Sequence, residues 1–282
     1  MAEPRIGGAT RVAAVLGWPV THSLSPVIHN AGFAALGMDW TYVALPVEPG
    51  EVPAAVAGLR ALGFAGANVT MPHKEAVADV MDDLTEDADR LRAVNTIEVV
   101  RDRLIGHNTD APGFARFLAH DVGFEPAGKT ALLFGAGGAA RACALAVARA
   151  GLTRIVVALR EPARAAPVAD ALDGFATEVE AIAFDDAAEA SADLVVNATP
   201  LGAHGEGLPL PKLGPDGLFV DLLYRPAMTP GQQAARAAGA QAVGGLGLLL
   251  HQAALSFELW TGRQAPLEVM SAAAVAALAE PP

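Results

Sequence analysis

A glycine-rich turn between a strand and a helix is the feature that most constrains the fold of this chain. In "TALLFGAGGAARACALAVARAG", an apolar run at residues 130–134 is followed by a glycine turn and then by a helical pattern. Gly135, Gly137 and Ala140 have the spacing G-x-G-x-x-A, which in this context is typical of a dinucleotide-binding fold. The first glycine permits the tight turn, the second lets a pyrophosphate approach the backbone, and the small third residue lets helix and strand pack closely. A glycine turn that serves only packing is the alternative.

Apolar runs of strand length alternate with helical patterns from residue 129 onward. Helical patterns fill most of the gaps, whereas the connection at 199–217 is rich in Gly and Pro and is expected to be a loop. Six strands in such a series predict a Rossmann-type, doubly wound parallel sheet, followed by helices at about 246–260 and 266–279. The expected strands are residues 130–134, 154–159, 178–184, 193–198, 218–223 and 241–243.

The first half of the chain predicts a separate α/β domain with a mixed sheet. Three strands alternate with two helices, which is a βαβαβ arrangement and implies parallel pairing. The segments "AVNTIEVV" and "RLIGHNT" flank a short polar turn and predict an antiparallel hairpin at the edge of that sheet. The pattern restarts after a helical segment at 112–122, so we place one domain at 1–112 and the other at 113–245. The expected strands are residues 11–18, 40–47 and 64–70, and the helices are 26–36 and 51–62.

Charge and hydropathy exclude several classes of protein. The chain has 19 Lys and Arg against 31 Asp and Glu, with a sequence pI near 4.9, so nucleic acid is not an expected partner. Its most apolar stretch is interrupted by Arg141 and Arg149, and the N-terminus lacks the pattern of a signal peptide. The single cysteine, Cys143, is expected to be a buried and inert thiol. We therefore expect a soluble, cytoplasmic α/β protein without a membrane span.

Two serines follow the first expected strand. In "THSLSP", Pro26 is expected to be the first helical residue and Ser25 its N-cap. Ser23 and Ser25 then place two hydroxyls beside a helix N-terminus, which suits a small carboxylate. The alternative is that Ser25 only caps the helix.

Other polar side chains gather where the strands of the first half end, the edge at which α/β sheets bind ligands. Each has an ordinary alternative, because Asn and Asp favour turns and Asp110 could cap a helix that starts at Pro112. Jointly they supply donors and acceptors for a polyhydroxylated ring that carries one carboxylate. The set comprises Asn68, Thr70, Asn95, Asn108, Thr109, Asp110 and, from the C-terminal helix, Gln252.

Lys74 breaks a local rule. In "NVTMPHKEAV", Pro72 is expected at the first helical position, so that Lys74 lies in the first turn. That end of a helix carries a partial positive charge and prefers anions. Locally unfavourable residues often mark functional sites, so Lys74 is a candidate functional residue.

The end of the second Rossmann strand bears on the choice of dinucleotide. NAD sites usually place an acidic residue there, whereas this chain has Leu159 and Arg160, with Arg164 one helical turn on. Two guanidinium groups suit the 2′-phosphate of NADP. Glu161 in the same loop would repel that phosphate, so NADP is favoured and NAD stays open.

Eight ordered motifs resemble those of shikimate dehydrogenases. They are "HSLSP", "NVTMPHK", "AVNT", "GHNTD", "GAGGAAR", "NATPLG", "DLLYRP" and "GLGLLLHQAALSFELWTG", and they span about residues 11 to 275. The resemblance implies a substrate-binding domain completed by the C-terminal helices, about 246–282, and an NADP-binding Rossmann domain. It also implies the reversible reduction of 3-dehydroshikimate to shikimate, a step towards aromatic amino acids.

The resemblance also implies residue roles. Ser23, Ser25 and Tyr224 would hold the substrate carboxylate. Lys74 and Asp110 would form the catalytic pair. The ring and its hydroxyls would be lined by Asn68, Thr70, Asn95, Asp110 and Gln252. The dinucleotide would be bound by Gly135, Ala136, Gly137, Gly138, Ala139, Arg160, Arg164, Asn197, Thr199, Gly245 and Leu248, and no metal is expected.

The chain departs from the family pattern at three places, one of which is the bulky Trp18 in "WPVTHS", near the substrate turn. The usual cofactor loop reads Asn-Arg-Thr, where this chain has Leu159, Arg160 and Glu161. Leu248 stands where methionine is common, a nearly isosteric exchange. The alternatives are an NAD-dependent dehydrogenase for quinate or shikimate, an aminoshikimate dehydrogenase, and a non-catalytic shikimate-binding regulator. Relatives that accept quinate often carry threonine at the position of Ser25, so Ser25 favours shikimate over quinate. A monomer and a homodimer are equally compatible with the sequence.

Overall fold

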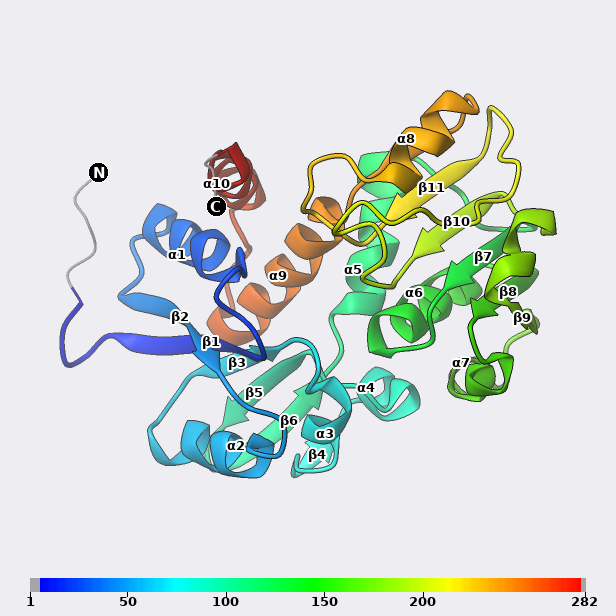
Figure 1. Ribbon diagram of the computed structural model, residues 1–282. Coiled ribbons are helices and arrows are strands. Elements are labelled where there is room, and N and C mark those ends of the chain that lie inside the picture. The colour runs from blue at the N-terminus through cyan, green and yellow to red at the C-terminus, as the bar shows by residue number, and fades with distance from the viewer. Residues whose placement is uncertain (1–5, 280–282) are drawn as a thin grey trace. The chain divides into compact units, whose positions relative to one another are not determined.

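The computed structural model describes residues 6–279 and is drawn as a ribbon in Figure 1. Its contacts divide the chain into two compact units. The first unit runs up to Thr109 and includes the segment from Leu250 onward, and the second unit is Asp110–Leu249. The boundaries expected near residues 112 and 246 differ from these by three and four residues.

Within the described residues, the first unit contains a six-stranded sheet in the order β2-β1-β3-β5-β6-β4. β1, β2 and β3 pair in parallel, β5 pairs antiparallel with both β3 and β6, and β4 joins β6 in parallel. The expected mixed sheet is therefore confirmed. Only β4 is unexpected, because two residues are too few to show a periodicity. The strands are β1 (Arg11–Gly17), β2 (Trp40–Pro46), β3 (Gly66–Val69), β4 (Asp83–Leu84), β5 (Thr96–Val100) and β6 (Arg103–His107).

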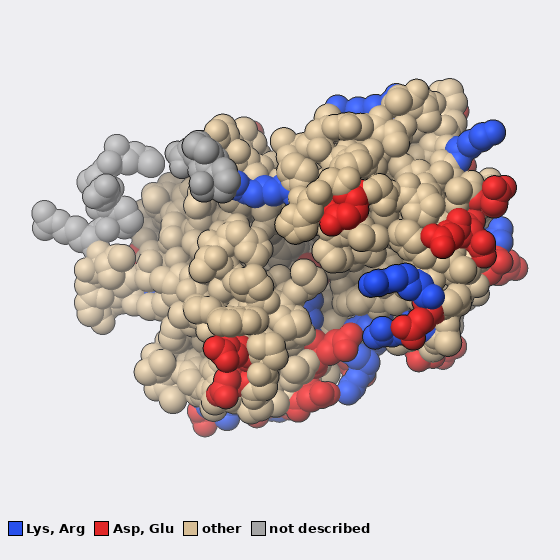
Figure 2. Space-filling model, viewed as in Figure 1, with Lys and Arg blue, Asp and Glu red and all other residues tan. Residues whose placement is uncertain are grey.

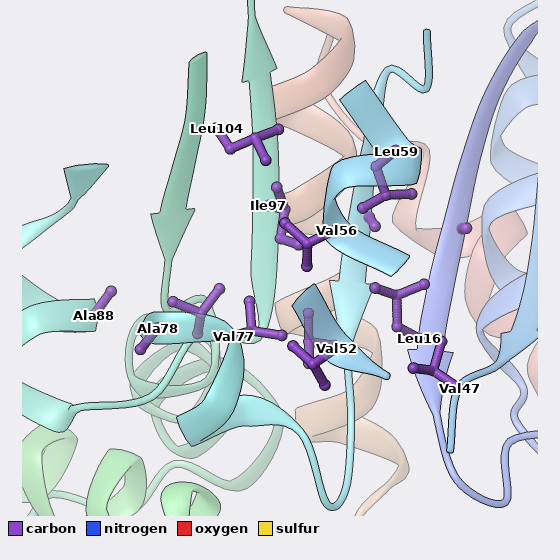
Figure 3. Close-up of a cluster of buried hydrophobic side chains, with 14 residues drawn as sticks. Leu16, Val47, Val52, Val56, Leu59, Val77, Ala78, Ala88, Ile97 and Leu104 are labelled. Carbon is purple, nitrogen blue, oxygen red and sulfur yellow. The ribbon is translucent and has the colours of Figure 1, made fainter. Parts of the chain in front are cut away.

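Aliphatic side chains form the core on one face of this sheet. Val52, Val56 and Leu59 recur at helical spacing along α2 (Val52–Ala61) and are buried. Figure 3 shows them directed towards sheet residues such as Leu16 and Ile97. Short helices α3 (Lys74–Ala78) and α4 (Glu86–Leu91) cover the rest of this face and add further apolar side chains to the same cluster.

Aromatic side chains fill the opposite face, which is covered by α1 (Ser25–Ala35), α9 (Leu246–Thr261) and α10 (Leu267–Ala279). The His29 ring of α1 stacks on Tyr42 of β2, with centroids 4.4 Å apart and planes at 6°. Phe33 of α1 stacks on Phe257 of α9 at 5.1 Å. Trp260 donates a hydrogen bond from Nε1 to the Ile97 carbonyl at 3.0 Å. These contacts explain why the segment from Leu250 onward belongs to the first unit.

The described part of the second unit contains a six-stranded parallel sheet in the order β12-β11-β10-β7-β8-β9. Counted along the chain, β7 lies next to both β8 and β10, so the strand order reverses there. This is the order of a doubly wound nucleotide-binding sheet, with the switch point at β7. The strands are β7 (Thr130–Phe134), β8 (Arg154–Leu159), β9 (Glu178–Ala183), β10 (Leu194–Asn197), β11 (Leu218–Asp221) and β12 (Gln241–Val243). The expected Rossmann-type fold is confirmed.

Helices connect most of these strands. Between β9 and β10 there is a 3₁₀ helix, Phe184–Glu189, and no α-helix among the described residues. The connection from β10 to β11 is an extended loop, as its Gly and Pro content predicts. The α-helices of the unit are α5 (Asp110–Phe117), α6 (Gly138–Arg149), α7 (Ala166–Ala171) and α8 (Pro230–Ala237), and a π-helical turn, Leu118–Val122, continues α5.

Charged side chains of both signs lie side by side on the face drawn in Figure 2. The ion pairs Arg60–Asp82, Arg92–Asp79 and Arg103–Asp83 of the first unit are formed by partly exposed side chains. Each such pair contributes about 0–1 kcal/mol, so the buried clusters dominate stability. In residues 6–279, no helix combines the length and the apolar character needed to cross a membrane.

Gly66 lies where β3 and α9 approach each other, which gives a test of this packing. A Cβ at Gly66 would overlap the Trp260 indole and lie 2.7 Å from the Ile97 carbonyl oxygen. Gly66→Ala is therefore expected to lower the free energy of unfolding by about 1–3 kcal/mol. Urea unfolding followed by circular dichroism measures the change.

Gly58→Ala in α2 is the control, because a Cβ there would meet nothing within 4 Å. It is expected to raise the free energy of unfolding by about 0.5–1 kcal/mol. Equal stability of the two variants would contradict the close approach of β3 and α9.

Candidate active site

The first unit brings several expected substrate residues to one edge of its sheet. β1 and β3 are parallel neighbours, so the loops that follow them leave the same edge. Ser23 and Ser25 follow β1, and Asn68 and Thr70 lie at the end of β3. Asn95 directly precedes β5 rather than lying in it, and Gln252 lies in α9.

Amide side chains join three of these segments. Asn68 donates from Nδ2 to the Asn95 carbonyl at 3.2 Å. Asn95 donates from Nδ2 to Gln252 Oε1 at 3.5 Å. All three side chains are buried. The structure therefore brings together Asn68, Asn95 and Gln252, as the sequence analysis expects of a common site.

Ser23 and Ser25 differ from their expected capping arrangement. α1 begins at Ser25 with Leu24 as its N-cap, so the expected capping role of Ser25 is wrong by one residue. Pro26 is correspondingly the second helical residue. Ser23 Oγ accepts a hydrogen bond from the Ser25 amide at 3.2 Å, which keeps the two serines together.

Lys74 is the first residue of α3, and His73 is its N-cap. The expected position of Pro72 at the start of the helix is therefore wrong. Pro72 lies inside a turn closed by a hydrogen bond from the His73 amide to the Thr70 carbonyl at 3.0 Å, and the helix starts after that turn. The Lys74 carbonyl accepts from the Val94 amide at 2.8 Å, which ties its backbone to the segment before Asn95.

Asp110 is a buried residue that begins α5. Its expected alternative role, as the cap of a helix starting at Pro112, is wrong because the helix already includes Asp110. The preceding residue, Thr109, donates its amide to Asn95 Oδ1 at 2.7 Å. Asp110 is therefore the residue that directly follows a member of the amide cluster's hydrogen-bond network.

In the second unit, the glycine turn leaves room for a ligand. Gly135 follows β7 with φ +105°, a conformation that favours glycine, and a Cβ there would lie 3.2 Å from the Ala198 carbonyl oxygen. At Gly137, the N-cap of α6, a Cβ would meet nothing within 4 Å and φ is ordinary. No protein contact requires a glycine at this position. The turn therefore fits a pyrophosphate against the α6 N-terminus, with Ala140 packed behind it.

The loop after β8 exposes the residues expected to distinguish NADP from NAD. Arg160, Glu161 and Arg164 are all exposed to solvent. The Arg164 amide donates to the Glu161 carbonyl at 3.0 Å, at the start of a 3₁₀ helix, Pro162–Ala165. Both guanidinium groups and the carboxylate are thus available to a phosphate in the same loop.

A buried carboxylate organises the ends of β10 and β11. Asp221 accepts hydrogen bonds from Asn197 Nδ2 at 3.0 Å, from the Leu223 amide at 3.1 Å and from Thr229 Oγ1 at 2.7 Å. Asn197 Oδ1 in turn accepts from the Thr199 hydroxyl at 2.7 Å. Burial raises the pKa of the Asp221 carboxyl, and the hydrogen bonds that it accepts oppose this rise.

Asp221 is a residue that the sequence analysis missed, although a single acid in the apolar run "LFVDLL" is a signal for it. It fixes the turn that leads to Tyr224, a half-buried residue in the loop after β11. Gly245 lies so close to the Leu222 carbonyl that a Cβ would overlap it, and Leu248 is buried in the first turns of α9. Tyr42, Thr96 and Ser256 of the first unit are further site residues that the sequence did not single out.

The acidic, histidine and cysteine side chains of residues 6–279 contain no group of three or more that could hold a metal ion.

Comparisons with known proteins match the chain over nearly its whole length. The model of the shikimate dehydrogenase substrate binding domain matches residues 15–97, and that of the shikimate 5′-dehydrogenase C-terminal domain matches residues 245–275. A shikimate dehydrogenase (NADP(+)) of Moorella thermoacetica is 48% identical over 276 residues, covering 94% of this chain and 93% of that protein.

Two solved structures have a similar fold. Shikimate 5-dehydrogenase from Thermus thermophilus, in complex with NADP(H) and shikimate, is 39% identical with a TM-score of 0.86, covering 95% of this chain and 100% of its own. A shikimate dehydrogenase in complex with NADP+ is 33% identical with a TM-score of 0.89, covering 99% of both chains.

The open space at Gly137 gives a test of dinucleotide binding. Gly137→Ala is expected to leave the Tm within about 2 °C, because the Cβ meets no protein atom within 4 Å. The KM for the dinucleotide is expected to rise about tenfold, a loss of about 1.4 kcal/mol, because the methyl group enters the space of the pyrophosphate. Thermal unfolding and steady-state kinetics measure the two quantities.

Gly214→Ala serves as the matched control, since its Cβ also meets nothing within 4 Å. An unchanged KM for the dinucleotide in the Gly137 variant would contradict the assignment of this glycine to the binding site.

Proposed function

This chain belongs to the shikimate dehydrogenase family, and we propose that it catalyses the reversible NADP-dependent reduction of 3-dehydroshikimate to shikimate. The observation that carries the proposal is the buried amide cluster of Asn68, Asn95 and Gln252. Lys74 accepts a backbone hydrogen bond from Val94, next to Asn95, and Thr109, the residue before Asp110, donates its amide to Asn95. Such a cluster supplies several donors and acceptors to a hydroxylated ring, and Lys74 is the proposed acid–base residue. The reaction belongs to the biosynthesis of aromatic amino acids, which we expect in the cytoplasm.

The substrate has one carboxylate and a ring with hydroxyl groups. In this proposal the hydroxyls of Ser23 and Ser25 hold the carboxylate, with Tyr224 as a further donor. Hydroxyl donors suit a carboxylate because charge-assisted hydrogen bonds are stronger than neutral ones. The amide side chains of the cluster recognise the ring hydroxyls, because an amide both donates and accepts.

Lys74 and Asp110 perform the proton transfer in this proposal. The bound NADPH supplies the hydride that reduces the ketone carbon. As charge develops on the ketone oxygen, the Lys74 ammonium stabilises it and donates a proton, which yields the hydroxyl. Asp110 orients the ammonium as its anionic partner. In the oxidation direction, the Lys74 amine takes the proton from the same hydroxyl.

The dinucleotide is held by the second unit in this proposal. The turn Gly135–Ala139 and the α6 N-terminus take the pyrophosphate, and Arg160 and Arg164 take the 2′-phosphate. Asn197 and Thr199 border the cofactor, with their side chains fixed by the Asp221 hydrogen bonds. Gly245 and Leu248 lie beside the nicotinamide.

Initial rates of dinucleotide reduction test the proposed function. Purified protein is assayed with shikimate and with quinate, each with NADP+ and with NAD+. The highest kcat/KM is expected for shikimate with NADP+. A preference for quinate or for NAD+ would contradict the proposed specificity, and folded protein that binds shikimate without turnover would identify a regulator.

Replacement of Lys74 tests the acid–base assignment. Lys74→Ala is expected to lower kcat by about 10²–10⁴-fold, because the proton donor is lost, with an NADP+ KM within about threefold of the wild type. Lys212→Ala, at an exposed lysine in the loop before β11, is the control and is expected to retain the wild-type kcat. A kcat for Lys74→Ala within threefold of the wild-type value would contradict the assignment of Lys74 as the proton donor.

Glu161 is expected to weaken NADP+ binding by repelling its 2′-phosphate. Glu161→Thr is therefore expected to lower the KM for NADP+ by about two- to fivefold, an effect of the size of an exposed charge pair, and to leave the KM for NAD+ unchanged. The difference should shrink at high salt, because exposed charges are screened.

Glu125→Thr is the control, since it removes an exposed carboxylate before β7, at the opposite edge of the sheet. If Glu161→Thr lowers both KM values equally, the effect is not exerted on the 2′-phosphate.

A further inference from the structure

The side-chain amide of Asn68 has all its hydrogens used inside the protein. Its Nδ2 lies 2.9 Å from Ser256 Oγ, 3.0 Å from Thr96 Oγ1 and 3.2 Å from the Asn95 carbonyl oxygen. Its Oδ1 accepts from the Tyr42 hydroxyl at 2.7 Å. An amide nitrogen has two hydrogens, so three nearby acceptors leave none for a ligand. Asn68 can therefore only accept from a substrate hydroxyl, through the second lone pair of Oδ1.

The direction of these hydrogen bonds follows from one group. The Asn95 carbonyl can only accept, so the amide nitrogen of Asn68 must face it. The amide oxygen then faces Tyr42, and the Tyr42 hydroxyl must be the donor.

Tyr42 itself is held on several sides. Its amide donates to Asn30 Oδ1 at 2.8 Å, and its carbonyl accepts from Asn30 Nδ2 at 2.9 Å. Its ring stacks on that of His29, and burial lowers the pKa of His29 to about 3, so the stacked imidazole is neutral. Burial also raises the pKa of Tyr42 well above its ordinary value, so the phenol keeps its proton.

The arrangement extends from Asn68 to other expected substrate residues. Thr96 Oγ1 lies 2.9 Å from Ser256 Oγ and 3.1 Å from Thr109 Oγ1. Asn95 donates from Nδ2 to Thr109 Oγ1 at 2.9 Å and from the same atom to Gln252 at 3.5 Å. The orientation of one amide thus influences that of the next.

We propose that Tyr42 is a positioning residue of the substrate site, whose hydroxyl orients the Asn68 amide and, through Thr96 and Ser256, the amide of Asn95. The proposal rests on the proposed function, because the substrate that it positions is shikimate. Removing the hydroxyl leaves Asn68 Oδ1 buried without this donor, so the amide oxygen is held less firmly. An amide oxygen that shifts from its position accepts less well from the substrate hydroxyl.

Tyr42→Phe removes only the hydroxyl and keeps the ring that stacks on His29. The KM for shikimate is expected to rise about tenfold, while the KM for NADP+ stays within about twofold of the wild type. Thr177→Val is the matched control, because it removes a buried hydroxyl that donates to the Leu152 carbonyl at 2.7 Å in the second unit. It is expected to lower the Tm similarly and to leave the KM for shikimate unchanged.

A double-mutant cycle separates positioning from general destabilisation. If Tyr42 acts through Asn68, Tyr42→Phe should have no further effect on shikimate binding in an Asn68→Ala background, as measured by titration calorimetry. Equal additional losses in both backgrounds would overturn the proposal. An unchanged shikimate KM in folded Tyr42→Phe would also overturn it.

Two further measurements keep the test decisive. If Tyr42→Phe does not fold, Asn68→Ala alone tests whether the amide held by Tyr42 contacts the substrate, and it is expected to raise the KM for shikimate; an unchanged KM there overturns the proposal. Wild-type turnover of shikimate is measured first. An inactive wild type contradicts the proposed function, whereas an active wild type with an unaffected variant contradicts only the role of Tyr42.

Discussion

The hydrogen bonds of the buried Asn68 amide are the constraint on which the first unit depends. This side chain is 5% exposed, and it joins β3 to β2, β5 and α9 through Tyr42, Thr96 and Ser256. A buried amide without partners costs about 1–3 kcal/mol, so these elements are favoured only in the arrangement that satisfies it. The same requirement holds α9 on a sheet whose strands lie within residues 11–107.

The second unit depends on glycine rather than on a polar cluster. Gly135 adopts a φ of +105° at the switch point of the sheet, and Gly137 leaves the α6 N-terminus open. Asp221 fixes the ends of β10 and β11 by its hydrogen bonds to Asn197 and to the Leu223 amide. The loops that carry Thr199 and Tyr224 therefore start from fixed positions, and β10 lies next to β7, which leads into the glycine turn. Buried amides thus suit the recognition of a hydroxylated ring, and an open helix end suits a pyrophosphate.

Local patterns in the sequence were sufficient to predict the strands of the Rossmann sheet and the mixed sheet, because alternating apolar runs and glycine turns are local signals. They were not sufficient to place Pro72 and Ser25, since a turn or cap moved by one or two residues leaves the pattern unchanged. Tyr42 and Ser256 could not be predicted as site residues for another reason. Ser256 is 188 residues from Asn68 along the chain, and contacts of that kind leave no local mark. The roles of Lys74, Asp110 and the other site residues stay predictions.

A crystal structure of the protein with NADP+ and shikimate tests the central claim most directly. The account predicts Lys74 Nζ within about 3.2 Å of the hydroxyl that is oxidised, Ser23 and Ser25 on the carboxylate, and Asn68 accepting through Oδ1. Shikimate bound with its carboxylate on Lys74, or with the oxidised hydroxyl remote from both Lys74 and Asp110, would contradict the account.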